Sequence, residues 1–106
     1  MSELFPLPGD ISLTSNVVNA IRDGYRHVPG VPNPLASIEF GIPVDRAKPS
    51  HWVISFFSKD YASAETIWRI EDIELALSQD AQNRLRHKIV DIAKGEIVVY
   101  NKPLQS

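Results

Sequence analysis

The sequence predicts an α+β fold, a small two-layer domain in which two main helices pack on one face of a mostly antiparallel sheet of three or four strands. Two segments with apolar residues at helical spacing, and several short runs of branched and aromatic residues, predict these elements. The length of 106 residues corresponds to a single domain, residues 1–106. With 43% hydrophobic residues, the chain can bury an apolar core.

The N-terminal segment, residues 1–9, is expected to be an extended arm because its two prolines and its glycine interrupt a helix or a central strand. A helix is expected over residues 15–26, where apolar residues recur at helical spacing. These apolar positions are Val17, Val18, Ile21 and Tyr25. Thr14 or Ser15 offers a hydroxyl that can cap the first turn. Gly24 weakens the helix by about 1 kcal/mol relative to alanine and is a possible end point.

Residues 28–36 are expected to form a stiff connector because three closely spaced prolines leave few backbone donors for regular structure. A strand is expected over residues 37–42, where apolar and polar residues alternate as in a strand with one face in water. The apolar positions of this strand are Ile38, Phe40 and Ile42. Residues 52–57 are apolar on both faces and are therefore expected to form the central strand of the sheet.

The second half of the chain has one ambiguous segment and one clear one. Residues 64–77 fit either a strand or a helix, and we expect a strand over residues 65–70 followed by helical turns. The clearest helical pattern runs from Ser78, a suitable capping residue, to Lys94. Its apolar stripe consists of Ala81, Leu85, Ile89 and Ile92.

A last strand is expected over residues 96–100, after Gly95 ends the preceding helix. We expect this strand at a sheet edge, where unpaired backbone groups favour a homodimer and where Lys94 and Lys102 flank the edge. The expected core combines the doubly apolar strand with the apolar stripe of the long helix. Its predicted members are Trp52, Ile54, Phe56, Leu85, Ile89 and Ile92.

The composition excludes several classes of chemistry. The chain has no cysteine, which removes disulfides, thiolate metal sites and cysteine nucleophiles, and it favours a reducing compartment, so the cytoplasm is the expected location. The three histidines are far apart, and no phosphate-binding or dinucleotide motif occurs, so neither a metal nor a cofactor is expected. No apolar run is long enough to cross a bilayer, so no membrane partner is expected.

Two histidines remain candidates for a small hydrolase or isomerase. His87 precedes Asp91 by one turn of the expected helix, a spacing that could orient the imidazole for proton transfer. His51 and Asp60 lie at the ends of the expected central strand, next to serines, so a serine, a histidine and an aspartate could meet there. No nucleophile motif supports either arrangement, and a non-enzymatic role is favoured.

Charge is distributed unevenly along the chain. Residues 60–80 carry six carboxylates against one arginine, which predicts an acidic surface. Two aromatic residues in this range would make suitable anchors for a partner. The predicted protein-binding residues are Asp60, Tyr61, Glu65, Trp68, Glu71, Asp72 and Glu74.

Residues 81–106 carry a surplus of cations instead. The alternative nucleic-acid-binding face consists of Arg84, Arg86, Lys88 and Lys94, with Arg22 and Arg26 of the first helix contributing. The net charge of −2 argues against general nucleic-acid binding. The leading hypothesis is therefore a small protein-binding module whose acidic and aromatic surface holds a basic protein partner, as small inhibitors of the toxin-neutralising immunity type do.

Overall fold

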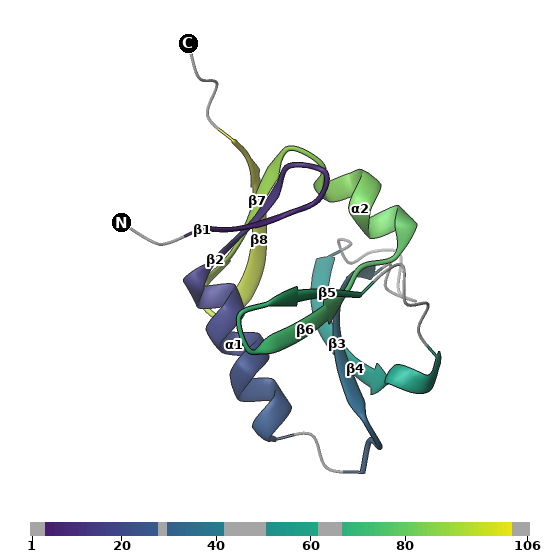
Figure 1. The fold of residues 1–106 in the computed structure, drawn as a ribbon. Coiled ribbons are helices and arrows are strands. Elements are labelled where there is room, and N and C mark those ends of the chain that lie inside the picture. Colours follow the sequence, from purple (N-terminus) through teal and green to yellow (C-terminus); the bar gives the residue numbers. More distant parts are fainter. Residues whose placement is uncertain (1–3, 28–29, 42–50, 62–66, 103–106) are drawn as a thin grey trace.

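Two four-stranded sheets and two α-helices make up the computed structural model (Figure 1). The structure describes residues 4–27, 30–41, 51–61 and 67–102. The predicted α+β arrangement, with two helices on one face of a single sheet, is wrong, because the fold consists mostly of strands and these divide between two sheets.

The first sheet has the strand order β1-β2-β7-β8. Its strands are β1 (Leu4–Leu7), β2 (Ile11–Thr14), β7 (Lys88–Ala93) and β8 (Glu96–Asn101). The β1–β2 and β7–β8 pairs are antiparallel hairpins, whereas β2 runs parallel to β7 with Ser12 opposite Ile89. All four residues of β2 are buried, because this central strand is covered on both faces.

The second sheet has the order β4-β3-β6-β5. Its strands are β3 (Pro34–Gly41), β4 (His51–Ser58), β5 (Ile67–Ile70) and β6 (Ile73–Ala76). Two antiparallel hairpins again meet through one parallel pair, β3 with β6. A short 3-10 helix, η1 (Lys59–Tyr61), follows β4.

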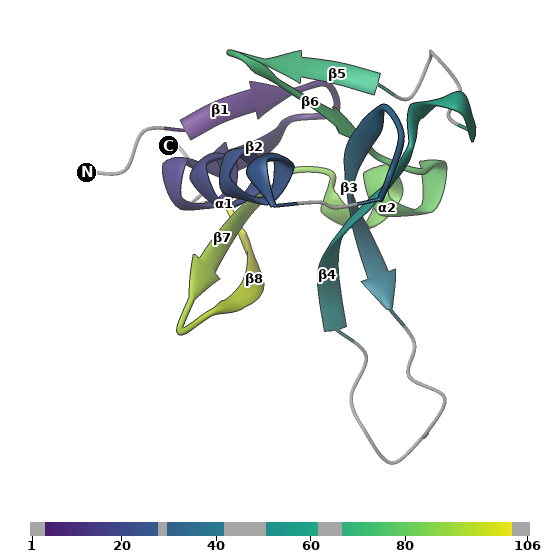
Figure 2. The same ribbon diagram turned by 90° about the horizontal axis from the view of Figure 1, so that it is seen from below.

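Each helix links the two sheets instead of covering one of them. Helix α1 (Ser15–Arg26) contacts β2 and β7 of the first sheet and β3 and β6 of the second. Helix α2 (Gln79–Leu85) contacts β7 of the first sheet and β3 of the second. Figure 2 shows α1 beside β7 of the first sheet and α2 beside β3 of the second.

The two halves of the chain repeat one order of elements: two strands, a helix and two strands. The first half supplies β1 to β4 with α1, and the second supplies β5 to β8 with α2. Each half gives one hairpin to each sheet, because β2 pairs with β7 and β3 pairs with β6. The halves are therefore interleaved, and neither contains a whole sheet.

The predicted first helix is confirmed as α1, although its two special residues act differently from the prediction. Thr14 precedes the helix, but its hydroxyl donates to Asp91 Oδ1 at 2.6 Å and makes no cap hydrogen bond. Gly24 does not end the helix. It admits the ring of Phe56, since a Cβ added at this position would lie 2.7 Å from Cε2 of the ring and closer still to Cζ.

The predicted long second helix is only half correct. Ser78 caps α2 as expected, with its hydroxyl accepting from the Ala81 amide at 3.1 Å. The helix ends at Leu85, however, and His87 takes a left-handed conformation with φ of 63° before β7 begins. The predicted helical residues 88–93 are therefore a strand.

The predicted roles of β3 and β4 are reversed. β3 is the inner strand, and its residues 35–38 are buried on both faces, whereas β4 is an edge strand of partly buried residues. The apolar residues of β4 are explained by contacts beyond its own sheet, with β8 and with Gly24 of α1. Ile42 lies outside the described residues.

Three smaller predictions also need correction. The N-terminal arm contains the strand β1, and the connector ends earlier than expected because β3 begins at Pro34. The strand expected over residues 65–70 is confirmed as β5, but the helical turns expected after it are the strand β6. Residues 28–29 and 62–66 lie outside the described part. β8 lies at a sheet edge as predicted, and self-association through that edge stays a prediction.

The core lies between the two sheets and the two helices. Its largest fully buried side chains are Ile11, Leu13, Ile21, Leu35, Ile38, Leu75, Leu77 and Leu85. Of the predicted core residues, Leu85 and Ile89 are buried. The other four pack against the core while remaining partly exposed: Trp52, Ile54, Phe56 and Ile92.

Candidate functional site

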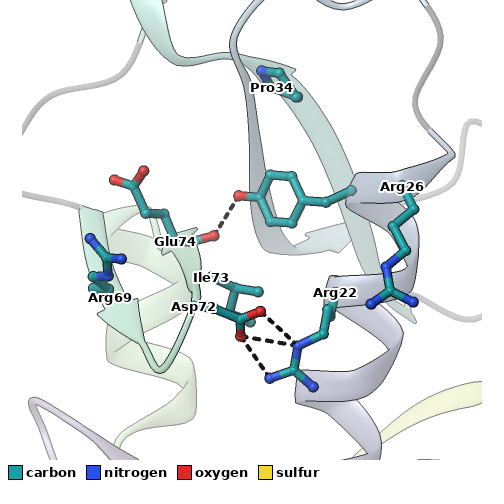
Figure 3. A pocket seen from close by; sticks show the side chains of 8 residues that line it. Arg22, Arg26, Pro34, Arg69, Asp72, Ile73 and Glu74 are labelled. Atoms are coloured by element: carbon teal, nitrogen blue, oxygen red, sulfur yellow. Dashed lines mark hydrogen bonds and ion pairs between the residues drawn. The ribbon is translucent and has the colours of Figure 1, made fainter.

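A cleft of about 320 Å³ opens between α1 and the β5–β6 hairpin (Figure 3). It lies beside three of the carboxylates predicted to form the protein-binding surface. Its lining consists of Arg22, Tyr25, Arg26, Pro34, Arg69, Asp72, Ile73 and Glu74. We call it the hairpin cleft.

Tyr25 fixes the geometry of the hairpin cleft. Its hydroxyl donates to the Glu74 carbonyl at 2.5 Å and accepts from the Ala36 amide at 2.8 Å, so it joins α1 to both inner strands of the second sheet. Its ring meets Phe56 edge to face, with 5.1 Å between the ring centres. Burial raises the pKa of Tyr25, so the phenol stays protonated at neutral pH.

Arg22 holds the turn of the β5–β6 hairpin. Its guanidinium donates to Asp72 from Nε at 3.0 Å and from Nη2 at 2.8 Å, and Nη2 also donates to Glu71 at 2.9 Å. Hydrogen bonding to Arg22 lowers the pKa of Asp72 below its usual value. Figure 3 shows the Asp72 carboxylate directed at Arg22 across the mouth of the cleft. The two carboxylates are thus fixed, yet the side chains of Glu71 and Asp72 remain 51% and 64% exposed.

The other charged groups of this region are arranged on either side. Glu74 pairs with Lys59 of η1 at 2.8 Å. Arg69 donates from Nε to the Glu71 carbonyl at 3.3 Å, and its side chain is exposed. Arg26 is also exposed, and within the described residues neither Arg26 nor Arg69 forms an ion pair. The cleft therefore carries fixed carboxylates at the hairpin turn, with the guanidinium group of Arg69 on the hairpin wall and that of Arg26 on the α1 wall (Figure 3).

The acidic surface expected from residues 60–80 contains cations that come from other parts of the chain. The structure brings Glu71, Asp72 and Glu74 together on one hairpin, but Arg22 and Lys59 neutralise much of their charge. Asp60 is exposed, and Trp68 packs against the core. Glu65 and the side chain of Tyr61 lie outside the described part.

The cations of the alternative nucleic-acid face do not share a helix. Arg84 is on α2, where it pairs with Asp80 at 2.9 Å, and Arg86 follows the helix. Lys88 begins β7, whereas Lys94 lies in the turn beyond the far end of that strand. The predicted basic helix face is therefore divided, with Arg84 and Lys88 at one end of β7 and Lys94 at the other.

Neither histidine arrangement forms as predicted. His87 Nδ1 lies 3.0 Å from Asp10 Oδ2 and not beside Asp91, because the helix has already ended. Lys102 and then His87 lower the pKa of Asp10 through hydrogen bonds. His51 is exposed at the start of β4, while Asp60 lies beyond the other end, so the length of the strand separates them. Ser50 lies outside the described residues.

Two residues of the hairpin cleft, Arg22 and Arg26, are visible as candidates in the sequence, but they were assigned to the alternative nucleic-acid-binding face. Arg22 and Arg26 are one helical turn apart, a spacing that places them on one face of α1. The pairing of Arg22 with a distant hairpin cannot be read from spacing. Tyr25 looked like an ordinary core residue because only its position on the apolar face is visible in sequence.

Within the described ranges, no helix is long and apolar enough to cross a membrane, and no three or more metal-binding side chains come together. Comparison with protein-family models, with curated proteins and with solved structures found no match to this chain.

Proposed function

We propose that the protein is a non-enzymatic protein-binding module whose contact surface is the hairpin cleft. The observation that carries this proposal is the pair of carboxylates, Glu71 and Asp72, that Arg22 holds in place while leaving more than half of each side chain exposed. Because these groups are ordered before a partner arrives, less conformational entropy is lost on binding. Beside them lie Arg26 and Arg69, and arginine is enriched at the centres of protein interfaces.

The charges of the cleft define the partner's chemistry. A basic side chain of the partner fits the exposed oxygens of Glu71 and Asp72, and a carboxylate fits the guanidinium groups of Arg26 and Arg69. The expected partner is therefore not simply basic: its contact surface carries a basic residue next to an acidic one. Such complementarity raises the association rate and selects against partners with the opposite arrangement.

The lining favours binding over catalysis. Among the described lining residues there is no serine, threonine or histidine, and the hydroxyl of Tyr25 is committed to two backbone groups. The proposal includes a narrower role: an inhibitor of the immunity type that acts in a reducing compartment such as the cytoplasm.

A peptide-display library selected on the immobilised protein tests the proposal. We expect the selected peptides to carry a basic residue next to an acidic one. Arg26→Gln and Arg69→Gln should each weaken their binding at least fivefold in calorimetric titrations. Arg86→Gln, which removes an exposed arginine outside the cleft, is the matched control and should leave binding unchanged. Peptides that bind all variants equally, or a selection without binders, would contradict the proposal.

A further inference from the structure

A second groove lies between two hairpins of different sheets, with Arg84 of α2 in its lining. Figure 2 shows the β3–β4 and β7–β8 hairpins projecting to the same side of the molecule. The groove has a volume of about 400 Å³, within the range of small-ligand sites. Three aromatic residues and two cations line most of it: Phe40, Trp52, Tyr100, Arg84 and Lys88. We call it the aromatic groove.

The aromatic side chains of this groove are preformed. Phe40 and Trp52 are cross-strand neighbours in the β3–β4 hairpin, and their ring centres are 5.1 Å apart. On the opposite wall, Tyr100 of β8 is 45% exposed, and within the described residues only Leu4 among the other large hydrophobic residues is as exposed. Phe40 and Trp52 are partly buried, so Tyr100 offers the most exposed ring of the groove for stacking with a flat ligand.

The two cations stand at the same groove. The guanidinium carbon of Arg84 lies 4.4 Å from the centre of the Phe40 ring, and the side chain is 45% exposed despite its pair with Asp80. Lys88 Nζ donates to Asn101 Oδ1 at 2.5 Å, which is a neutral acceptor and leaves the lysine charge uncompensated there. None of the described lining residues carries a carboxylate. The local charge is therefore positive although the whole chain has a net charge of −2.

We infer that the aromatic groove binds a nucleobase with its phosphate, presented by single-stranded nucleic acid. A base stacks on the exposed ring of Tyr100 while Arg84 and Lys88 contact the phosphate, and this combination is how proteins bind single strands without reading their sequence. A duplex does not fit this chemistry because its bases are already stacked and paired. The site is separate from the hairpin cleft and does not depend on the function proposed for it.

Titration of the full chain with fluorescently labelled oligothymidylate, thymidine monophosphate and a duplex of mixed sequence tests the inference. We expect the single strand to bind more tightly than the duplex and at least tenfold more tightly than the monophosphate. Equal affinity for strand and monophosphate would overturn the strand as the occupant in favour of a free nucleotide. No binding of the strand at low salt would overturn the inference altogether.

Variants separate the two interactions. Tyr100→Ala removes an exposed ring and should weaken binding of the strand about tenfold. Lys88→Gln should weaken it and reduce the slope of log K against log salt by about 0.7. Lys94→Gln removes a lysine at the far turn of the same hairpin and should change neither affinity nor slope, while Arg26→Gln reports on the hairpin cleft alone. Binding that survives Tyr100→Ala and Lys88→Gln unchanged would overturn the assignment to this groove.

Discussion

Gly24 was recognised correctly as a poor helix former, but its structural role was predicted wrongly. Its low helix propensity suggested an end point, yet the helix continues because the missing side chain leaves room for the ring of Phe56. The glycine is visible in the sequence. The ring that occupies the space beside it belongs to β4, and no local sequence pattern predicts that β4 packs against α1 at this position.

Gly24→Ala should therefore destabilise the protein although alanine is the better helix former by about 1 kcal/mol. Overpacking against Phe56 should cost about 1–3 kcal/mol, measured as a lower free energy of unfolding in urea. In a Phe56→Leu background, the same change should become neutral or stabilising. A loss of equal size in both backgrounds would show that the ring is not the reason for the glycine.

Asp91 illustrates a carboxylate that has one neighbouring partner and one from a distant segment. Its Oδ1 accepts from the Thr14 hydroxyl at 2.6 Å and from the Ile92 amide at 2.8 Å. The hydrogen bond from Thr14 is the main cause of a lowered pKa for Asp91. Because the folded pKa is below the unfolded value of about 3.9, this interaction stabilises the fold above that pH and is lost as pH falls through the folded pKa.

Thr14→Val removes the donor from a buried position and keeps its shape, so it should lower the free energy of unfolding by about 1 kcal/mol near neutral pH. The difference from the natural protein should shrink as the pH falls below about 4. Urea titrations at a series of pH values measure this. Thr14→Ser keeps the hydroxyl and should keep the pH dependence. If the loss of stability in Thr14→Val did not change with pH, the hydrogen bond to Asp91 would not be its cause.

At the scale of elements, local signals located most segments but not their partners. The capped start of α2 and the strand β8 are visible in sequence, since a serine cap and a run of branched residues act locally. The end of α2 is not, because Ile89 and Ile92 fit a helical stripe as well as a strand. This segment forms a strand and not a helix because it pairs with β2, which lies in the first half of the chain.

The turn of the β7–β8 hairpin offers a test of local backbone chemistry. Lys94 and Gly95 connect the two strands, with φ of 53° and 78°, the left-handed values of a type I′ turn. A residue other than glycine or asparagine has a cost of about 1–2 kcal/mol in this conformation. Lys94→Asn should therefore raise the free energy of unfolding by roughly 0.5 kcal/mol. Lys94→Ala removes the same charge but does not favour the left-handed conformation. If it also raised the free energy of unfolding, the charge and not the turn would be the cause.

At the scale of the whole molecule, the charge pattern of the sequence and that of the surface differ. The acidic run 60–80 predicted a negative patch, and the carboxylates of its hairpin do gather. Their counter-charges come from α1 and η1, so the patch becomes a mixed cleft. Three members of the candidate site were therefore predictable from composition. The position of Arg22, Arg26 and Tyr25 at this cleft was not predictable, because only the tertiary fold places α1 against the hairpin.

Two of the hairpin turns also tie one half of the chain to the other. Asp72 in the β5–β6 turn pairs with Arg22 of α1, and Asp10 in the β1–β2 turn pairs with His87 after α2. The two contacts occupy corresponding places in the repeated order of elements. Together with the parallel strand pairs, they make each half dependent on the other.

We therefore expect that a chain cut within residues 62–66 gives two fragments that are unfolded alone and form a folded complex when mixed. Each fragment lacks the partner strands that complete its hairpins into sheets. Circular dichroism of the separate and mixed fragments measures this, and the melting of the mixture should be cooperative. A cooperative transition in either fragment alone would contradict the dependence.

Interleaving also sets when the protein can fold during its synthesis. Strand β2 is made well before β7, the neighbour that completes its place in the sheet. At about 5–20 residues per second, several seconds separate the two on the ribosome. Throughout that interval β2 and β3 have only their hairpin partners, so one edge of each apolar strand stays unpaired, and the native structure is delayed until β6 and β7 have been made.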